Sequence, residues 1–502
     1  MQESIPKRCL FAIRATDADT APGALRPEAV LSVHMASAKP DPTAARTGRF
    51  LSALARLVGD AGLLADPALL DRYASDWTGK NPCRPVAVLR PGSTAELSAA
   101  LAHCHAERWP VVVQGGLTGL AGGATPQPGE IALSLERLKG IEEIDASSGH
   151  MIVRAGTTLA AVQDAAGEEG MSFMLDLPSR GSCTIGGNIA TNAGGNRVLR
   201  YGMTRNQVLG LEAVLADGTV MSSLGTVMKD NAGYDLKQLF IGTEGTLGVV
   251  TRASLRLHPE PPERLTALVA LGSFARLVGL LGTLRRTLGA GLCAFEAMWD
   301  SYFECVLHTN QLARPFSARH PFYALLEVEL LSPTQDRERV ERVLFEVLEH
   351  GAARDAIVAA SLDEAARLWH IRESAGEMLG RLAPTVGYDI SLPLPRMDSY
   401  VEEVRAGCER LLGGRPFCAF GHLGDGNLHL FAALASAEDA AAMDAIVYGA
   451  LAGLGSVSAE HGIGVSKRSW LGLTRTPTEI ALMRGLKQHL DPSGILNPGR
   501  VL

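Results

Sequence analysis

The chain has 502 residues, of which 46% are hydrophobic and 20% are charged, and it carries a formal net charge of −7 with a pI near 6.0. The length predicts roughly three domain-sized units, and the composition is typical of a soluble globular protein. Because the balance is acidic and no basic run exceeds Lys467-Arg468, a nucleic-acid partner is not expected.

The eight cysteines form no C-x-x-C pair, which argues against an iron–sulfur cluster, a zinc ribbon and a disulfide framework and favours a reducing, cytoplasmic location. No apolar run is long enough to predict a transmembrane segment. Residues 1–49 lack periodicity and carry acids that argue against a targeting peptide, so they are left unassigned. Met35 is an alternative start, because organised patterns begin only near Phe50.

The first organised elements lead into a glycine-rich loop, Q-G-G-L-T-G-L-A-G-G, at residues 114–123. Pro126 and Pro128 follow at once, so no helix can open there as it would in a Rossmann unit. The loop can still cradle a phosphate with its backbone N–H groups, with the Thr118 hydroxyl as a further donor, although a structural turn is equally compatible. Before it we expect a helix over 50–58, then strand, helix and strand over 86–89, 94–107 and 111–113, with a Ser93/Glu96 capping box.

Residues 178–195 read P-S-R-G-S-C-T-I-G-G-N-I-A-T-N-A-G-G and organise this half of the chain. Five glycines alternate with hydroxyl and amide side chains, a pattern that predicts no packed core but a surface against which a flat heteroaromatic ring can lie. A flexible surface loop is the alternative. A third loop, I-G-T-E-G-T-L-G at 241–248, suggests one extended ligand crossing all three. The other elements expected are strands at 131–135, 151–155 and 249–257, a helix at 159–168, and a hairpin from 211–216 that turns at Asp217-Gly218.

A proline-rich break at 259–262 predicts a domain boundary. Strands and helices then alternate, which indicates an α+β sheet with helices on one face. We expect strands at 265–271, 292–295, 323–330 and 389–392 and helices at 274–288, 299–308, 336–350, 362–379 and 479–490.

A candidate metal site lies in G-H-L-G-D-G-N-L-H-L, residues 421–430. A hairpin turning at Asp425-Gly426 would put His422 directly opposite His429, with Cβ atoms about 5 Å apart, although paired histidines are more often structural. Glu460, in S-A-E-H-G-I-G, would complete a two-histidine, one-carboxylate set with open positions for substrate. The adjacent His461 is then free to move protons, and Arg372 could clamp a carboxylate.

These motifs, in this order, resemble the vanillyl-alcohol-oxidase-type flavoproteins, in the branch of D-lactate dehydrogenase, D-2-hydroxyglutarate dehydrogenase and the glycolate oxidase flavin subunit. The resemblance covers the chain from about residue 50 to its end. It implies an α+β protein with a two-subdomain PCMH-type FAD-binding domain at 50–259, an α+β, ferredoxin-like substrate or cap domain with the metal site at 260–470, and a segment at 471–502 that returns to the FAD domain.

The resemblance also implies site roles. His422, His429 and Glu460 would hold zinc or manganese, His461 would be the base, and Arg372 would bind substrate. FAD is expected to be non-covalent, because the first loop lacks the histidine through which some members tether it. Its implied contacts are Gly115, Gly116, Thr118, Gly119, Gly122, Gly123, Pro178, Ser182, Thr184, Gly186, Gly187, Ala190, Thr191, Gly195, Gly245, Val249 and Asn497.

Three departures concern the substrate. Where the 2-hydroxyglutarate branch has a lysine, an asparagine and a hydroxyl residue, this chain has Gly387, Phe431 and Gly376. Losing those polar groups puts a second substrate carboxylate in doubt and favours a monocarboxylic or apolar-tailed hydroxy acid.

The expected reaction is oxidation of a D-2-hydroxy acid to the 2-oxo acid, with hydride transfer to flavin N5 and a divalent metal on the substrate hydroxyl and carboxylate. These motifs do not identify the electron acceptor, which is expected to be an electron-transfer flavoprotein, a quinone or a cytochrome. They are also compatible with a homodimer. Three alternatives remain: a flavin subunit of a glycolate-oxidase-like complex, a non-redox metal-dependent hydrolase and, less favoured, a transferase like alkylglycerone-phosphate synthase.

Overall fold

The computed structural model describes residues 42–502, so the predicted features of residues 1–41, Met35 included, lie outside the described part of the chain. Residues 48–502 form one compact unit. Within this unit, Phe50 of helix α1 (Pro42–Val58) stacks on Trp109 with ring centroids 4.2 Å apart. No helix among residues 42–502 is long and apolar enough to cross a membrane.

The first sheet has four strands in the order β1-β2-β4-β3; β2, β4 and β3 run parallel, and β1 is antiparallel to β2. Helix α3 (Thr94–Glu107) packs Leu97 and Leu101 into the same buried core as Leu133. The Ser93 hydroxyl caps α3 by accepting from Glu96 N–H, but the Glu96 carboxylate accepts from Gly92 N–H, so the predicted capping box is only half right. The strands are β1 (Leu63–Leu64), β2 (Val88–Leu89), β3 (Val111–Gln114) and β4 (Ile131–Ser134).

The second sheet has five antiparallel strands in the order β5-β6-β10-β8-β9. The hairpin predicted at Asp217-Gly218 is confirmed, because β8 and β9 pair from Leu211↔Ser223 to Val214↔Val220. The strands of this sheet are β5 (Ile141–Asp145), β6 (His150–Arg154), β8 (Val208–Val214), β9 (Val220–Ser223) and β10 (Val249–Arg256). The same part of the chain contains helices α4 (Leu159–Glu168), α6 (Val198–Tyr201) and α7 (Thr204–Gln207) and a separate antiparallel pair, β7 (Met171–Ser172) and β11 (His258–Pro259).

The glycine-rich stretch 178–195 is not a continuous loop. Its middle forms a short helix, α5 (Ile185–Thr191), which the Thr184 hydroxyl caps by accepting from Gly187 N–H. The prediction that this stretch contributes to no packed core is therefore wrong, because Ile185 and Ile189 are buried in the same core as α3. The glycines hid the helical spacing of these two isoleucines.

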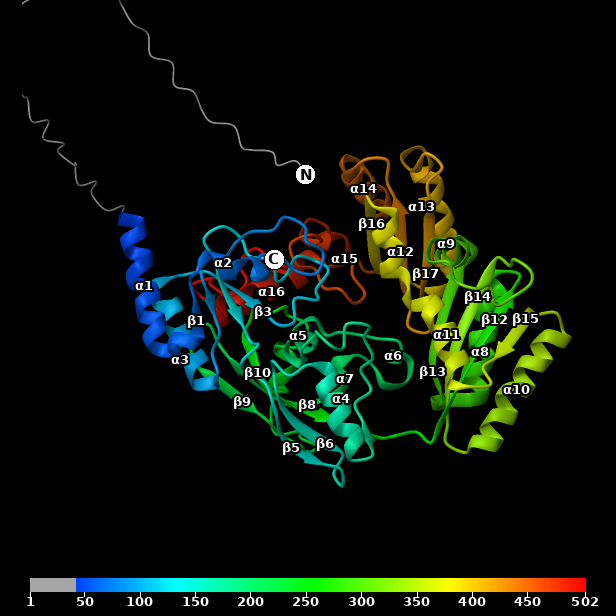
Figure 1. The fold of residues 1–502 in the computed structure, drawn as a ribbon, viewed down its shortest axis with the longest axis horizontal. Coiled ribbons are helices and arrows are strands. Elements are labelled where there is room, and N and C mark those ends of the chain that lie inside the picture. Colours follow the sequence, from blue (N-terminus) through cyan, green and yellow to red (C-terminus); the bar gives the residue numbers. More distant parts are fainter. Residues whose placement is uncertain (1–41) are drawn as a thin grey trace, which may run out of the picture. The chain divides into compact units, whose positions relative to one another are not determined.

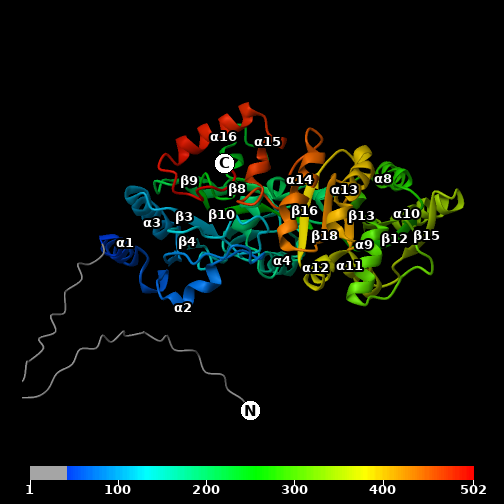
Figure 2. The same cartoon turned by 90° about the horizontal axis from the view of Figure 1, so that it is seen from above.

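The third sheet has seven antiparallel strands in the order β15-β12-β14-β13-β17-β18-β16. Helices α8, α10, α13 and α14 pack against one face, and α9, α11 and α12 pack against the other, as Figure 2 shows for α13 and α14 against α9 and α12. The α+β class is confirmed, but the prediction of helices on one face is wrong. Alternate residues of β12 enter the two cores, with Ala267 on one side and Leu268 on the other, so both faces need covering.

The single helix predicted at 362–379 is two helices, which part at Ser374, whose hydroxyl donates to His370 C=O. The elements are β12 (Glu263–Leu271), α8 (Phe274–Leu288), β13 (Leu292–Trp299), α9 (Asp300–Asn310), β14 (Phe322–Leu330), α10 (Pro333–Glu349), β15 (Ala353–Val358), α11 (Leu362–Glu373), α12 (Ala375–Leu382), β16 (Thr385–Ser391), α13 (Met397–Leu412), β17 (Phe417–His422), β18 (Asn427–Ala433) and α14 (Ala440–Leu451).

The C-terminal segment packs on the first sheet. Leu496 forms a parallel bridge with Val111, and the red end of the ribbon runs beside β3 (Figure 1). Arg500 is buried and pairs with the Glu130 carboxylate. The helices of this segment are α15 (Leu471–Thr474) and α16 (Pro477–Leu490), and α2 (Pro67–Leu70) lies between β1 and β2 in the chain.

Candidate active site

His422 and His429 lie on the same face of the β17–β18 hairpin, with ring centroids 5.5 Å apart. The predicted register is wrong by two residues, because His429 stands opposite Phe420 and not opposite His422. The turn explains the difference: it spans residues 423–426 instead of Asp425-Gly426 alone, and the N–H groups of Asp425 and Gly426 both donate to His422 C=O. A shift of two residues preserves the face on which each side chain lies, and the two imidazoles still meet.

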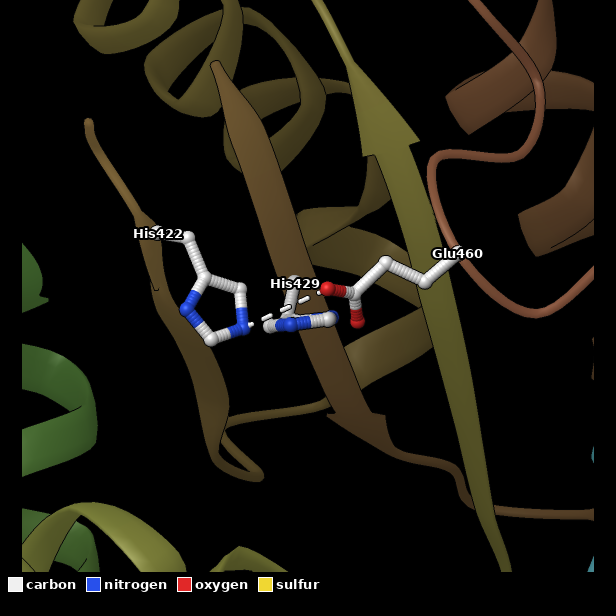
Figure 3. A group of neighbouring side chains, drawn as sticks. All are labelled: His422, His429 and Glu460. Atoms are coloured by element: carbon white, nitrogen blue, oxygen red, sulfur yellow. Dashed lines mark ion pairs between the residues drawn. The ribbon is translucent and has the colours of Figure 1, made fainter. Parts of the chain in front are cut away.

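Glu460 reaches the two histidines from the loop after α14. One potential ligand atom of each of the three side chains lies within 4.8 Å of the others, and Figure 3 shows the three side chains pointing toward one another. His422 Nε2 is 3.6 Å from Glu460 Oε1. Two imidazoles and a carboxylate form a donor set suited to zinc or manganese, so these residues fit a divalent metal.

Asp389, Glu460 and His461 form a second group with metal-ligand spacing. The Asp389 carboxylate is already fully engaged, however. One oxygen accepts from the Asn427 amide, and the other accepts from the backbone N–H groups of Glu460 and His461 and from Lys467 Nζ. The first group therefore fits a metal better, and Asp389 holds the loop that carries Glu460.

Burial and the neighbouring charges favour the deprotonated form that binds a metal at His429, but not at His422 or Glu460. Burial, which outweighs the attraction of Asp389, lowers the pKa of His429 well below its usual range. Burial also raises the pKa of Glu460 to about 7. Burial works against the charged form of His422, but the carboxylates of Glu296 and Glu460 outweigh it and raise its pKa to about 9.

Glu296 links the candidate metal site to Arg372. One carboxylate oxygen lies 2.7 Å from His422 Nδ1, which leaves Nε2 directed at Glu460, and the other accepts from Arg372 Nε at 2.8 Å. A carboxylate behind a metal-binding histidine fixes its ring orientation. Sequence reasoning missed Glu296, although a single acid inside the apolar run L-C-A-F-E-A-M-W indicates a buried, paired carboxylate.

Arg372 is buried against the sheet face that carries the histidines. Its guanidinium lies 4.5 Å from the ring centroid of Phe420, and its Nη2 lies 3.4 Å from His422 Nε2. Among residues 42–502, no acceptor bonds its Nη1. A fixed guanidinium with a free N–H edge is suited to bind a carboxylate.

His461 follows Glu460 and has 30% of its side chain exposed. Its Nδ1 lies 3.7 Å from the Asp389 carboxylate, and its ring stacks with that of His429 at 6.0 Å. Burial outweighs the attraction of Asp389 and lowers the pKa of His461. At neutral pH the imidazole is therefore neutral and can accept a proton.

Whether a phosphate fits the first glycine-rich loop depends on the backbone N–H groups of residues 116–120. They donate to no acceptor within the described chain. Consecutive free N–H groups at the end of a strand form an anion-binding nest, so the loop fits a pyrophosphate. The loop is held from behind, where Gly122 N–H donates to Asp76.

Most of the candidate flavin residues lie where the glycine-rich segments meet. A Cβ on Gly116 would lie 2.0 Å from Ser182 C=O, and one on Gly195 equally close to Asp176 C=O, so these glycines allow backbones to pack on each other. Gly115 lies against Thr184, Gly186 against Ala155, and Gly245 against Asn497, while Gly119 faces open space. Within α5, the Thr191 hydroxyl donates to Gly187 C=O, and Ala190 C=O accepts from Glu244 N–H. Val249 begins β10, and Pro178 is exposed.

The flavin segments and the metal site are in direct contact. A Cβ on Gly194 would lie 3.0 Å from Glu460 Oε1. On the far side of His461, the Glu244 carboxylate accepts from the N–H groups of Ile463 and Gly464. The sequence does not predict a role for Glu244, because nothing in the motif I-G-T-E-G-T-L-G indicates a partner more than 200 residues away.

Family models match the two halves of the chain. Residues 85–223 match an FAD binding domain, and residues 260–501 match the C-terminal domain of FAD linked oxidases. The chain is similar to a D-2-hydroxyglutarate dehydrogenase of Xanthomonas citri pv. viticola, with 40% identity over 88% of this chain and 94% of the relative. It is also similar to the mitochondrial D-2-hydroxyglutarate dehydrogenase of Bos taurus, with 41% identity over 90% and 83% of the two chains.

Among solved structures, p-cresol methylhydroxylase superposes with a TM-score of 0.73 and 16% identity, covering 91% of this chain and 97% of that one. At this identity the match concerns the fold alone. The chain shares this fold, with the glycine-rich segments and the histidine hairpin in one compact unit.

Proposed function

From the premise that this chain belongs to the FAD-linked oxidases, in the branch of the D-2-hydroxy-acid dehydrogenases, we propose that it oxidises a D-2-hydroxy acid to the corresponding 2-oxo acid. One observation carries the proposal. The two-histidine, one-carboxylate group stands between a free guanidinium edge, a neutral histidine and the glycine segment 194–195. Each of these groups has a task in the same oxidation.

His422, His429 and Glu460 would hold a divalent metal, zinc or manganese, which supplies a Lewis acid for the substrate hydroxyl and one carboxylate oxygen. The segments 115–123 and 182–195, with Gly245, Val249 and Asn497, would hold FAD non-covalently, and FAD supplies the hydride acceptor at N5. We accordingly assign FAD binding to residues 50–259 and 471–502 and substrate binding to residues 260–470.

Arg372 and His461 act on the substrate directly in this proposal. The free Nη1 edge of Arg372 binds the substrate carboxylate, and Glu296 and Phe420 keep the guanidinium in place. His461 accepts the hydroxyl proton, since its imidazole is neutral and Asp389 fixes its backbone. The carboxylate, the hydroxyl proton and the hydrogen that leaves toward the flavin would thus be addressed from three sides, which selects one configuration at the reacting carbon.

The test is an anaerobic titration of the purified holoprotein with D- and L-2-hydroxy acids, followed by the flavin absorbance. We expect bleaching with D-enantiomers only, and the L-enantiomer of each acid is the matched control. If no D-acid of a broad panel bleaches the flavin, the proposal is wrong. A colourless protein that hydrolyses esters would instead support the metal-dependent hydrolase, and bleaching only after addition of a partner would support a glycolate-oxidase-like subunit.

The electron acceptor of the reduced flavin is proposed only by class: an electron-transfer flavoprotein, a quinone or a cytochrome. The seven described cysteines are all free thiols, in keeping with a cytoplasmic location, whereas the bovine relative is named as mitochondrial.

A further inference from the structure

An aromatic surface adjoins the candidate metal site. Phe431 lies two residues beyond His429 on β18, so its side chain shares the sheet face of that ligand. Its ring centroid is 5.4 Å from that of Phe420, which in turn lies 5.1 Å from the His429 ring and beneath Arg372. The face next to the metal ligands is therefore aromatic.

Gly387 is the cross-strand partner of Phe431, on β16. A Cβ on Gly387 would lie 2.4 Å from one ring carbon of Phe431 and 2.7 Å from another. The Phe431 ring thus occupies the space that any side chain at position 387 would need. We call these two residues the Gly387–Phe431 pair. While the Phe431 ring keeps its position, a larger residue at position 387 is excluded.

The Gly387–Phe431 pair lies at the open side of the site. Gly387 is exposed and Phe431 is half-buried, whereas Phe420, His422 and His429 are buried. Glu460 is covered by the flavin segment at Gly194 on another side. A substrate tail that extends on this side would meet the exposed Gly387 and the half-buried Phe431 ring rather than the buried ligands.

We infer that the substrate is a D-2-hydroxy monocarboxylic acid with an apolar tail, and that the tail lies against the Phe431 ring. This inference rests on the proposed function. Neither a glycine nor a phenylalanine side chain offers a hydrogen-bond donor or a positive charge, and the face of an aromatic ring is electronegative. A second carboxylate placed there would lose water without gaining a partner, whereas an alkyl tail gains contact with the ring.

A matched pair of substrates tests the inference. D-2-hydroxyvalerate and D-2-hydroxyglutarate have the same five-carbon chain and differ in a terminal methyl against a carboxylate. We expect kcat/KM for the valerate to exceed that for the glutarate by about 100-fold in the holoprotein, because the charged end is left unpaired. Equal or better use of the glutarate would overturn the apolar tail while leaving the proposed function intact. Failure of every D-acid to bleach the flavin would instead remove the proposed function.

Exchanging the pair provides the second test. Gly387→Lys combined with Phe431→Asn removes the ring and adds a cation, and we expect the valerate-to-glutarate ratio to fall by at least about 10-fold. Phe431→Leu is the matched control, which keeps an apolar wall and should keep the preference for the valerate. Visible spectra and metal analysis show whether each variant retains its site. A double variant that keeps FAD and metal but has an unchanged ratio would place the tail elsewhere and overturn the inference.

Discussion

The two sides of the candidate site are built in opposite ways. The flavin side consists of backbone, with free N–H groups at 116–120 and glycines at 116 and 195 that let one segment pack on another. The metal side consists of side chains from two strands, His422 and His429, and from a loop, Glu460, with the buried carboxylates of Glu296 and Asp389 behind them. The comparison teaches that the packed glycines of the first side, such as Gly116 and Gly195, tolerate no added side chain, whereas the second side tolerates no lost one.

Loss of a candidate metal ligand should have the largest effect on turnover. His429→Ala removes one of three ligands from a buried position, so we expect loss of metal and a fall in kcat/KM of roughly 1,000-fold, or about 4 kcal/mol of transition-state stabilisation. Metal analysis and steady-state kinetics measure both. The flavin spectrum is the control, because the glycine side is untouched; a variant that keeps full activity without metal would contradict the metal assignment.

On the flavin side, the matched test adds a single methyl group. Gly116→Ala places a Cβ 2.0 Å from Ser182 C=O, so we expect about 3 kcal/mol of lost stability in the apo protein, measured by thermal or chemical unfolding. Gly119→Ala is the control, since its Cβ meets nothing within 4 Å, and the apo stability should stay unchanged. Because that open space faces the nest, Gly119→Ala should weaken FAD binding instead. Equal stability losses in the two variants would refute this division.

Glu244 lies on a flavin-side segment and binds the loop that carries His461 on the metal side. Its removal should therefore affect catalysis without loss of FAD or metal. Glu244→Gln keeps one acceptor for Ile463 and Gly464 but loses the other, and the loop carrying His461 should loosen. We expect kcat to fall by about 10- to 100-fold while FAD and metal stay bound, as for other residues that orient a site from behind. Rapid-mixing measurement of flavin reduction isolates this step, and an unchanged rate would show that the loop keeps its position without Glu244.

The smallest expected effect concerns pH. Burial lowers the pKa of His461 below its ordinary value of 6.5, so the residue should lose its ability to accept a proton only as the pH falls through that lowered value. Flavin reduction should therefore be flat around neutrality and fall about tenfold per pH unit on the acid side. His461→Ala should be slow and lack this limb. Metal content must be followed across the range, because a limb that tracks metal loss would belong to Glu460.

The sequence predicted the flavin side and the metal side to different depths, for physical reasons. Glycine spacing beside strands identifies loops directly, but it concealed α5, whose helical spacing involves only Ile185 and Ile189. The histidine hairpin was predicted with the wrong register, yet with both rings on the correct face, because a two-residue shift leaves the alternation of side chains intact. Glu296 and Asp389 come from strands distant in sequence, and only the pairing of β13 and β16 in the sheet brings them to the histidines.

The bond between Val113 N–H and the Asn497 side chain joins positions 384 residues apart. During translation, β3 leaves the ribosome some ~20–80 s before its partner segment is synthesised. Chains that stop anywhere within the seven-stranded sheet lack Leu496, Asn497 and Arg500, and their first sheet is left with an uncovered edge at Val111. Nascent polypeptides should therefore acquire their cofactor only after release, and prematurely terminated ones should be substrates for cellular proteases.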